Sequence, residues 1–88
     1  MRLDKYLKIS LIFKTRSGSE KYFENDGILL NGKTAKQAAA VKIGDIITIK
    51  SPDKITEYRI LDIQEKNVSK QTAKTMYEIV KEEKVELF

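Results

Sequence analysis

The sequence has no histidine, no cysteine and a single proline. These absences exclude Cys/His zinc sites, thiol nucleophiles, disulfides and histidine acids or bases, so we expect no metal and no cofactor. The carboxylates Asp4, Glu20 and Asp45 are isolated in turn or cap positions, with no second catalytic group beside them. The four glycines are scattered and form no phosphate-cradling loop. The composition therefore argues against an enzyme.

Long apolar runs are also missing. The longest span four residues or fewer, whereas a membrane helix needs roughly 18. Three of the first five residues are charged and no long apolar segment follows them, so the amino terminus does not resemble a signal peptide. We therefore expect a cytoplasmic protein with no membrane partner. A chain of 88 residues has room for one small core, which predicts a single domain over residues 1–88.

The positive charge is concentrated in the first part of the chain. The net charge is +4, from 17 basic and 13 acidic side chains. Residues 1–50 contain 10 basic and five acidic side chains, a net of +5, whereas residues 51–88 contain seven basic and eight acidic ones, a net of −1. A local positive patch favours an anionic partner such as a phosphate backbone. The alternative is an ordinary solvated charged surface.

Periodicity predicts two helices at the amino terminus. A helical stripe runs through Leu3, Tyr6, Leu7 and Leu11. It predicts a helix over about residues 2–12, with Arg2, Lys5 and Lys8 on the opposite side. Residues 17–20 have the pattern of a capping box, which predicts a second helix to about Asn25 that buries Tyr22 and Phe23. Gly27 suits the left-handed position that ends a helix.

Turn signals and β-branched runs predict short strands. Asn31-Gly32 favours a tight turn between strands 28–30 and 33–36. A hairpin is predicted between strands 46–50 and 55–63. The alternation in residues 55–63 is imperfect, which either a bulge or burial on both faces would explain. Residues 37–40 fit a helical turn or a loop.

The last segment has helical spacing. Ala73, Met76, Tyr77 and Val80 form a stripe that predicts a helix over about residues 69–84, supported by surface pairs of Glu78 with Lys74 and Lys81. The stripe would dock on the protein's own sheet, or alternatively on a partner helix. We therefore predict an α+β fold, with two amino-terminal helices packed on a small, mostly antiparallel sheet and a carboxy-terminal helix.

Three stretches in a fixed order resemble a known family. They are Arg-Leu-Asp-Lys-Tyr-Leu at 2–7, Gly-Ile-Leu-Leu-Asn-Gly-Lys-Thr-Ala-Lys at 27–36 and Val-Lys-Ile-Gly-Asp at 41–45. Together they resemble the ribosomal-protein S4-type RNA-binding domain, the alpha-L motif. The resemblance places the motif core in about residues 1–50 and leaves a strand and helix for about residues 51–88.

The resemblance implies a role on the ribosome. It implies a stand-alone member that binds ribosomal RNA and tRNA on the large ribosomal subunit, in rescue or quality control of stalled ribosomes. Such a protein would be a monomer when free. The alternatives are a generic structured-RNA-binding module of a divergent paralogue, and a protein-interaction adaptor that uses the face with Met76 and Tyr77.

Six basic residues on or beside the matched motifs are the expected RNA-binding residues: Arg2, Lys5, Lys14, Arg16, Lys33 and Lys36. An arginine can hold a phosphate with two hydrogen bonds, and a lysine acts as a point charge. The free amides after Ser17 would add a helix N-terminus. Nothing in the set suggests base readout, so recognition by shape and backbone is expected. We assign Asn31-Gly32 and Gly44-Asp45 to turns.

The connector between the two helices departs from the family pattern. Leu11 and Thr15 stand where the family usually has arginines, and Lys14 and Arg16 keep a basic side chain. The loss of two phosphate contacts would reduce the salt dependence of RNA binding by a slope of about 2.

Overall fold

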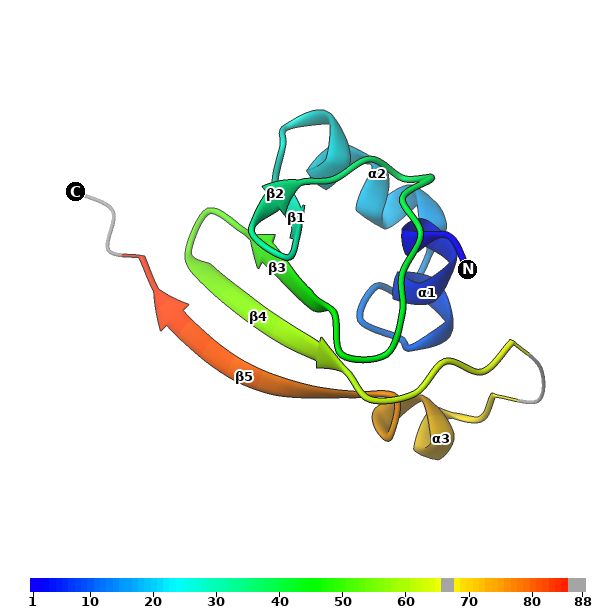
Figure 1. Cartoon of the computed structure of the whole chain (residues 1–88). Coiled ribbons are helices and arrows are strands. Elements are labelled where there is room, and N and C mark those ends of the chain that lie inside the picture. The colour runs from blue at the N-terminus through cyan, green and yellow to red at the C-terminus, as the bar shows by residue number, and fades with distance from the viewer. Residues whose placement is uncertain (66–67, 86–88) are drawn as a thin grey trace.

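The computed structural model describes residues 1–65 and 68–85, apart from the side chain of Arg16. Its elements are α1 (Leu3–Ile9), α2 (Arg16–Glu24), β1 (Ile28–Leu30), β2 (Lys33–Thr34), β3 (Ile46–Lys50), β4 (Lys54–Ile60), α3 (Lys70–Lys74) and β5 (Tyr77–Lys84). The two amino-terminal helices lie together on one side of the sheet, and α3 lies near the start of β5 (Figure 1). This arrangement confirms the predicted α+β fold.

The five strands form one antiparallel sheet in the order β2-β1-β3-β4-β5. The predicted hairpin of β3 and β4 is confirmed, although β4 ends at Ile60 rather than at residue 63. The register between β4 and β5 shifts between Glu57 and Tyr58, whose partners are Lys81 and Ile79, so the extra residue of this bulge, Val80, lies on β5. The bulge therefore does not explain the imperfect alternation in residues 55–63, which arises because β4 ends at Ile60. Figure 1 shows β4 and β5 as a long, curved ribbon that extends away from the helices.

The core lies between α1, α2 and one face of the sheet. Its buried residues include Leu3, Tyr6, Leu7, Phe23, Ile28, Ile47, Ile49, Ile60 and Met76. The predicted stripe of α1 is therefore correct except at Leu11, which is 45% exposed. The helix ends at Ile9, and Leu11 has a φ of 61°. That left-handed conformation ends the helix earlier than the spacing predicted.

Both ends of α2 differ in detail from the prediction. Thr15 is the N-cap, and its hydroxyl oxygen accepts a hydrogen bond from the Gly18 amide at 3.0 Å. Ser17 therefore lies inside the first turn, and the predicted capping box is wrong. At the other end Asp26, not Gly27, takes the left-handed conformation, with a φ of 55°. The predicted burial of Phe23 is confirmed, and Tyr22 is half-buried.

The predicted carboxy-terminal helix over residues 69–84 is wrong in its extent. Helix α3 has five residues, and residues 77–84 form β5 instead. Ala73 and Met76 are buried as their helical spacing predicted. The chain turns at Met76 because its carbonyl oxygen accepts hydrogen bonds from the Tyr6 hydroxyl and from the amides of Leu61 and Asp62.

Strand β5 covers the edge of β4 that would otherwise be unpaired. The rings of Tyr58 and Tyr77 meet edge to face, with centroids 5.3 Å apart. The carboxylate of Glu78 lies 2.7 Å from the guanidinium of Arg59, so this glutamate has a cross-strand partner instead of the helical partners expected. The backbone of β5 pairs with the N–H and C=O groups along the edge of β4. A helix in place of β5 would leave these edge groups of β4 to solvent.

A partly buried polar contact joins the two halves of the motif core. The predicted turn at Asn31-Gly32 is confirmed, with φ angles of 52° and 83°. The Asn31 side chain donates to the carboxylate of Asp45 at 3.1 Å and accepts from the Ile46 amide at 2.9 Å. Asp45 also accepts from the Lys42 amide at 3.0 Å, so it ties the first hairpin to the start of β3.

We predict that Asp45→Ala lowers the free energy of unfolding by about 2–3 kcal/mol, because the Lys42 amide and the Asn31 side chain lose a charged acceptor. Urea unfolding followed by circular dichroism measures this loss. Asp53→Ala, at an exposed turn, is the matched control and should change stability by less than about 0.5 kcal/mol. Equal effects of the two substitutions would contradict the assignment.

A second prediction concerns Tyr6, whose side chain is fully buried. Burial raises the pKa of its hydroxyl above the usual value of 10.0, so this group stays protonated and donates to Met76 at 2.8 Å. Tyr6→Phe should lower the free energy of unfolding by about 1 kcal/mol, because the Met76 carbonyl keeps two backbone donors. The same urea titration measures it, and an unchanged midpoint would contradict the role of this bond.

Candidate nucleic-acid interface

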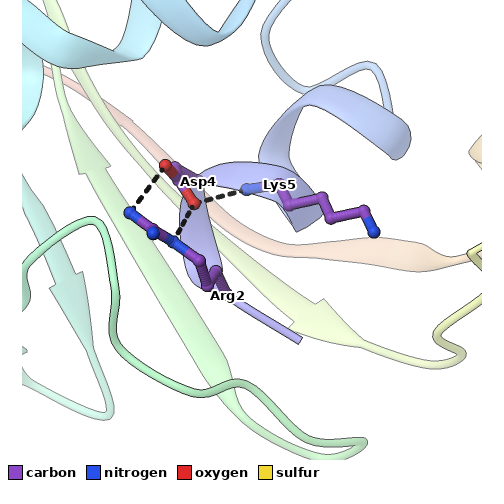
Figure 2. A network of polar contacts seen from close by, with 3 residues as sticks. All are labelled: Arg2, Asp4 and Lys5. Carbon is purple, nitrogen blue, oxygen red and sulfur yellow. Dashed lines mark hydrogen bonds and ion pairs between the residues drawn. The ribbon is translucent and has the colours of Figure 1, made fainter.

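Arg2 is the N-cap of α1 and is held by the acidic residue that follows it. Its Nε and Nη2 atoms lie 3.2 and 3.3 Å from the two carboxylate oxygens of Asp4. Asp4 is buried and also accepts from the Lys5 backbone amide at 2.8 Å, as Figure 2 shows. The Arg2 side chain is still 53% exposed. Asp4 therefore fixes the guanidinium while leaving part of it open to solvent.

The backbone around Arg2 is anchored to a distant loop. Arg2 forms an isolated bridge with Ala40, and the Leu3 amide donates to the Ala39 carbonyl at 2.8 Å. In this segment residues 37 and 38 form one hydrogen-bonded turn, in which the Ala39 amide donates to the Lys36 carbonyl at 3.0 Å, and a loop follows to Ala40. The bridge also brings together Arg2 and Lys36, which line one open depression of about 390 Å³ with Phe23, Glu24, Gln37 and Ala38.

Lys5 lies on a different side of α1 from Arg2. Figure 2 shows its side chain extending away from the Arg2–Asp4 pair. Its ammonium group is 3.8 Å from Glu65, and both side chains are about half-exposed, so the attraction is weak. Lys5 and Lys8 line a second depression of about 350 Å³. Lys8 is thus a further candidate cation, and its i, i+3 spacing from Lys5 was the available sequence signal.

The other predicted residues lie at separate places. Lys14 is exposed in the connector between α1 and α2. Arg16 is the first residue of α2, and its side chain lies outside the described part of the structure. Lys33 is exposed on β2, opposite Leu30 of β1. Of the predicted residues whose side chains are described, Arg2 and Lys36 share one depression.

Ion pairing differs between the two parts of the chain. On β4 and β5, Lys54 pairs with Glu82 at 3.2 Å and Lys81 with Glu83 at 3.6 Å. Within the described residues, Lys14, Lys33 and Lys36 form no ion pair. Their charge is available to an anionic partner, and they all belong to the basic first part of the chain.

The described residues 1–65 and 68–85 contain no helix that is long and apolar enough to span a membrane. In the same residues no three His, Cys, Asp or Glu side chains gather in a way that could hold a metal ion.

Comparison with known proteins adds family relationships. The S4 domain family matches residues 1–47. The RQC P-site tRNA stabilizing factor of Listeria monocytogenes is 42% identical over 86 residues, covering 98% of this chain and 92% of that protein. The factor of the same name from Bacillus subtilis is 35% identical over 85 residues, covering 97% and 98% of the two chains.

A heat shock protein also resembles the chain in structure. The solved structure of Vibrio cholerae heat shock protein 15, described as trimeric, superposes with a TM-score of 0.79 and 30% identity, covering 91% of this chain and 81% of that one. With a family match over residues 1–47 and relatives above 30% identity along nearly the whole length, the chain belongs to the S4 domain family and is a homologue of the RQC P-site tRNA stabilizing factors.

Proposed function

We propose that the protein binds ribosomal RNA and tRNA on the large ribosomal subunit, and stabilises the P-site tRNA in ribosome-associated quality control. The similarity to the stabilizing factors carries this proposal, because it covers 92–98% of the two relatives' lengths as well as this chain. The match to the S4 domain and to factors of this name supports a binding protein rather than an enzyme.

The Arg2–Asp4 pair suggests how one phosphate contact is made. An arginine whose guanidinium is already oriented loses little side-chain entropy when it binds a phosphate. Asp4 supplies that orientation through hydrogen bonds to two nitrogen atoms of Arg2. Lys36 lines the same depression and adds a second positive charge beside Arg2, which would attract the neighbouring phosphate of the nucleic acid. We infer that Arg2 is the best-positioned phosphate ligand and that Asp4 is a positioning residue.

The remaining cations would extend the contact along the nucleic acid. Lys5, Lys14, Arg16 and Lys33 come from four different segments, α1, the connector, α2 and β2. A set spread over separate elements suits a folded RNA with several phosphates at fixed distances. This supports recognition by shape and backbone, as in structured RNA generally.

The structure does not offer the surface on which the protein-interaction adaptor hypothesis depended. The hypothesis needed Met76 and Tyr77 facing outward from a carboxy-terminal helix. Met76 is fully buried, and Tyr77 is half-buried against Tyr58 in the sheet. A partner helix therefore has no such stripe to dock on.

Sucrose-gradient sedimentation of cell extract tests the ribosomal role. We expect the protein to migrate with large subunits that carry peptidyl-tRNA, and Arg2→Ala combined with Arg16→Ala to move it to the top of the gradient. Lys54→Ala combined with Arg59→Ala, which removes two positive charges from the β4–β5 ion pairs with Glu82 and Glu78, is the charge control and should migrate like the natural protein. Migration of the natural protein apart from large subunits, when these are stalled, would refute the proposal.

The positioning role of Asp4 makes a prediction opposite to simple electrostatics. Asp4→Asn removes a negative charge beside the RNA, which by Coulomb attraction alone would strengthen binding. If Asp4 orients Arg2, the substitution should instead weaken binding to structured RNA about fivefold, close to 1 kcal/mol. Fluorescence anisotropy at fixed salt measures the affinity, with circular dichroism as a check on folding.

The Asp4→Asn result is interpreted through a double-variant cycle. In the Arg2→Ala background, Asp4→Asn should have no weakening effect, because its target is gone. Equal weakening in both backgrounds would show that Asp4 acts on the fold and not through Arg2.

A further inference from the structure

A third depression with basic side chains lies at the carboxy-terminal end of α2. Lys21 and Tyr22 of α2, Gly27 before β1, and Lys50 with the β3–β4 turn line about 590 Å³ of open space. It shares no lining residue with the depression that contains Arg2 and Lys36. In Figure 1 the β3–β4 turn lies on the opposite side of the molecule from the amino terminus.

Gly27 allows the two walls of this depression to come together. The Gly27 amide donates to the Tyr22 carbonyl at 2.7 Å, and the Lys50 amide donates to the Gly27 carbonyl at 2.8 Å. A Cβ atom at Gly27 would lie 3.2 Å from the carbonyl oxygens of both Tyr22 and Lys50. Such contacts are tighter than side chains normally make. A glycine here therefore keeps the end of α2 against the end of β3.

The side chains in the depression combine an aromatic surface with free positive charge. The Tyr22 ring is held by an edge contact with Phe13, with centroids 5.0 Å apart, and remains half-exposed. Lys21 and Lys50 are exposed, and within the described residues neither forms an ion pair. Arg2 and Lys5, by contrast, each have an acidic neighbour. Asp26 is the acidic side chain of the lining, so the depression carries a net positive charge.

We propose that this depression binds one unpaired nucleotide of the RNA, with the base against Tyr22 and the flanking phosphates near Lys21 and Lys50. An aromatic ring accepts the face of any base, and lysines attract the adjacent phosphates without reading sequence. This inference rests on the proposed RNA binding and adds a contact between the end of α2 and the β3–β4 turn. It predicts a preference for RNA with an extruded nucleotide over fully paired RNA.

The test compares a hairpin RNA that carries one bulged nucleotide with the same hairpin fully paired. Fluorescence anisotropy should show about tenfold tighter binding of the bulged RNA by the natural protein. Lys21→Gln with Lys50→Gln, and separately Tyr22→Leu, should abolish that preference. Tyr22→Phe keeps the ring and should retain it. Lys70→Gln with Lys74→Gln removes the same charge from exposed positions on α3 and should also retain the preference.

Amide chemical shifts provide an independent readout. The resonances of Gly27 and Lys50 should move on addition of the bulged hairpin and stay in place with the paired one. Equal binding of the two hairpins by the natural protein, unaffected by the Lys21 and Lys50 substitutions, would overturn this site and leave RNA binding intact. Failure to bind either hairpin would overturn both this site and the RNA-binding proposal.

Discussion

The carbonyl oxygen of Met76 is the point at which the two parts of the chain are joined. It accepts hydrogen bonds from the Tyr6 hydroxyl at 2.8 Å and from the amides of Leu61 and Asp62 at 2.8 and 3.1 Å. One atom thus connects α1, the end of β4 and the start of β5. Because the contact is buried away from water, its loss would leave polar groups without partners, which is costly. The position of α1, and with it Arg2, depends on the carboxy-terminal strand being in place.

This connection also explains where sequence-based prediction succeeded and where it failed. Leu3, Tyr6 and Leu7 have a local helical spacing, and the structure buries all three. Met76 has an equally good helical spacing with Ala73, but its carbonyl bonds are made with residues 61, 62 and 6. Periodicity carries no information on such long-range partners. Residues 77–84, beyond Met76, form a strand because they pair with the edge of β4. Local spacing alone does not reveal this pairing.

The candidate site shows the same division between local and distant information. The motif residues were found from their order along the chain, and Lys14, Lys33 and Lys36 are indeed exposed. From the sequence, Asp4 was interpreted as an isolated carboxylate, because Arg2 and Asp4 are two residues apart and residues at that spacing do not face each other on a helix. The pair forms because Arg2 is the N-cap and has extended backbone angles, with φ −72° and ψ 145°. The meeting of Arg2 with Lys36 required the Arg2–Ala40 bridge, which no local pattern indicates.

Ion pairing across the sheet makes the distribution of the net charge of +4 uneven over the molecule. Antiparallel pairing of β4 and β5 places Arg59 directly opposite Glu78, and Lys54 pairs diagonally with Glu82, so opposite charges pair across the two strands. Such surface pairs add little stability, but they cancel much of the field on that side of the molecule. The motif half has a net charge of +5 and has Lys14, Lys33 and Lys36 without ion pairs among the described residues. A phosphate backbone approaching the protein is therefore attracted to the helical end, where the fixed guanidinium of Arg2 lies.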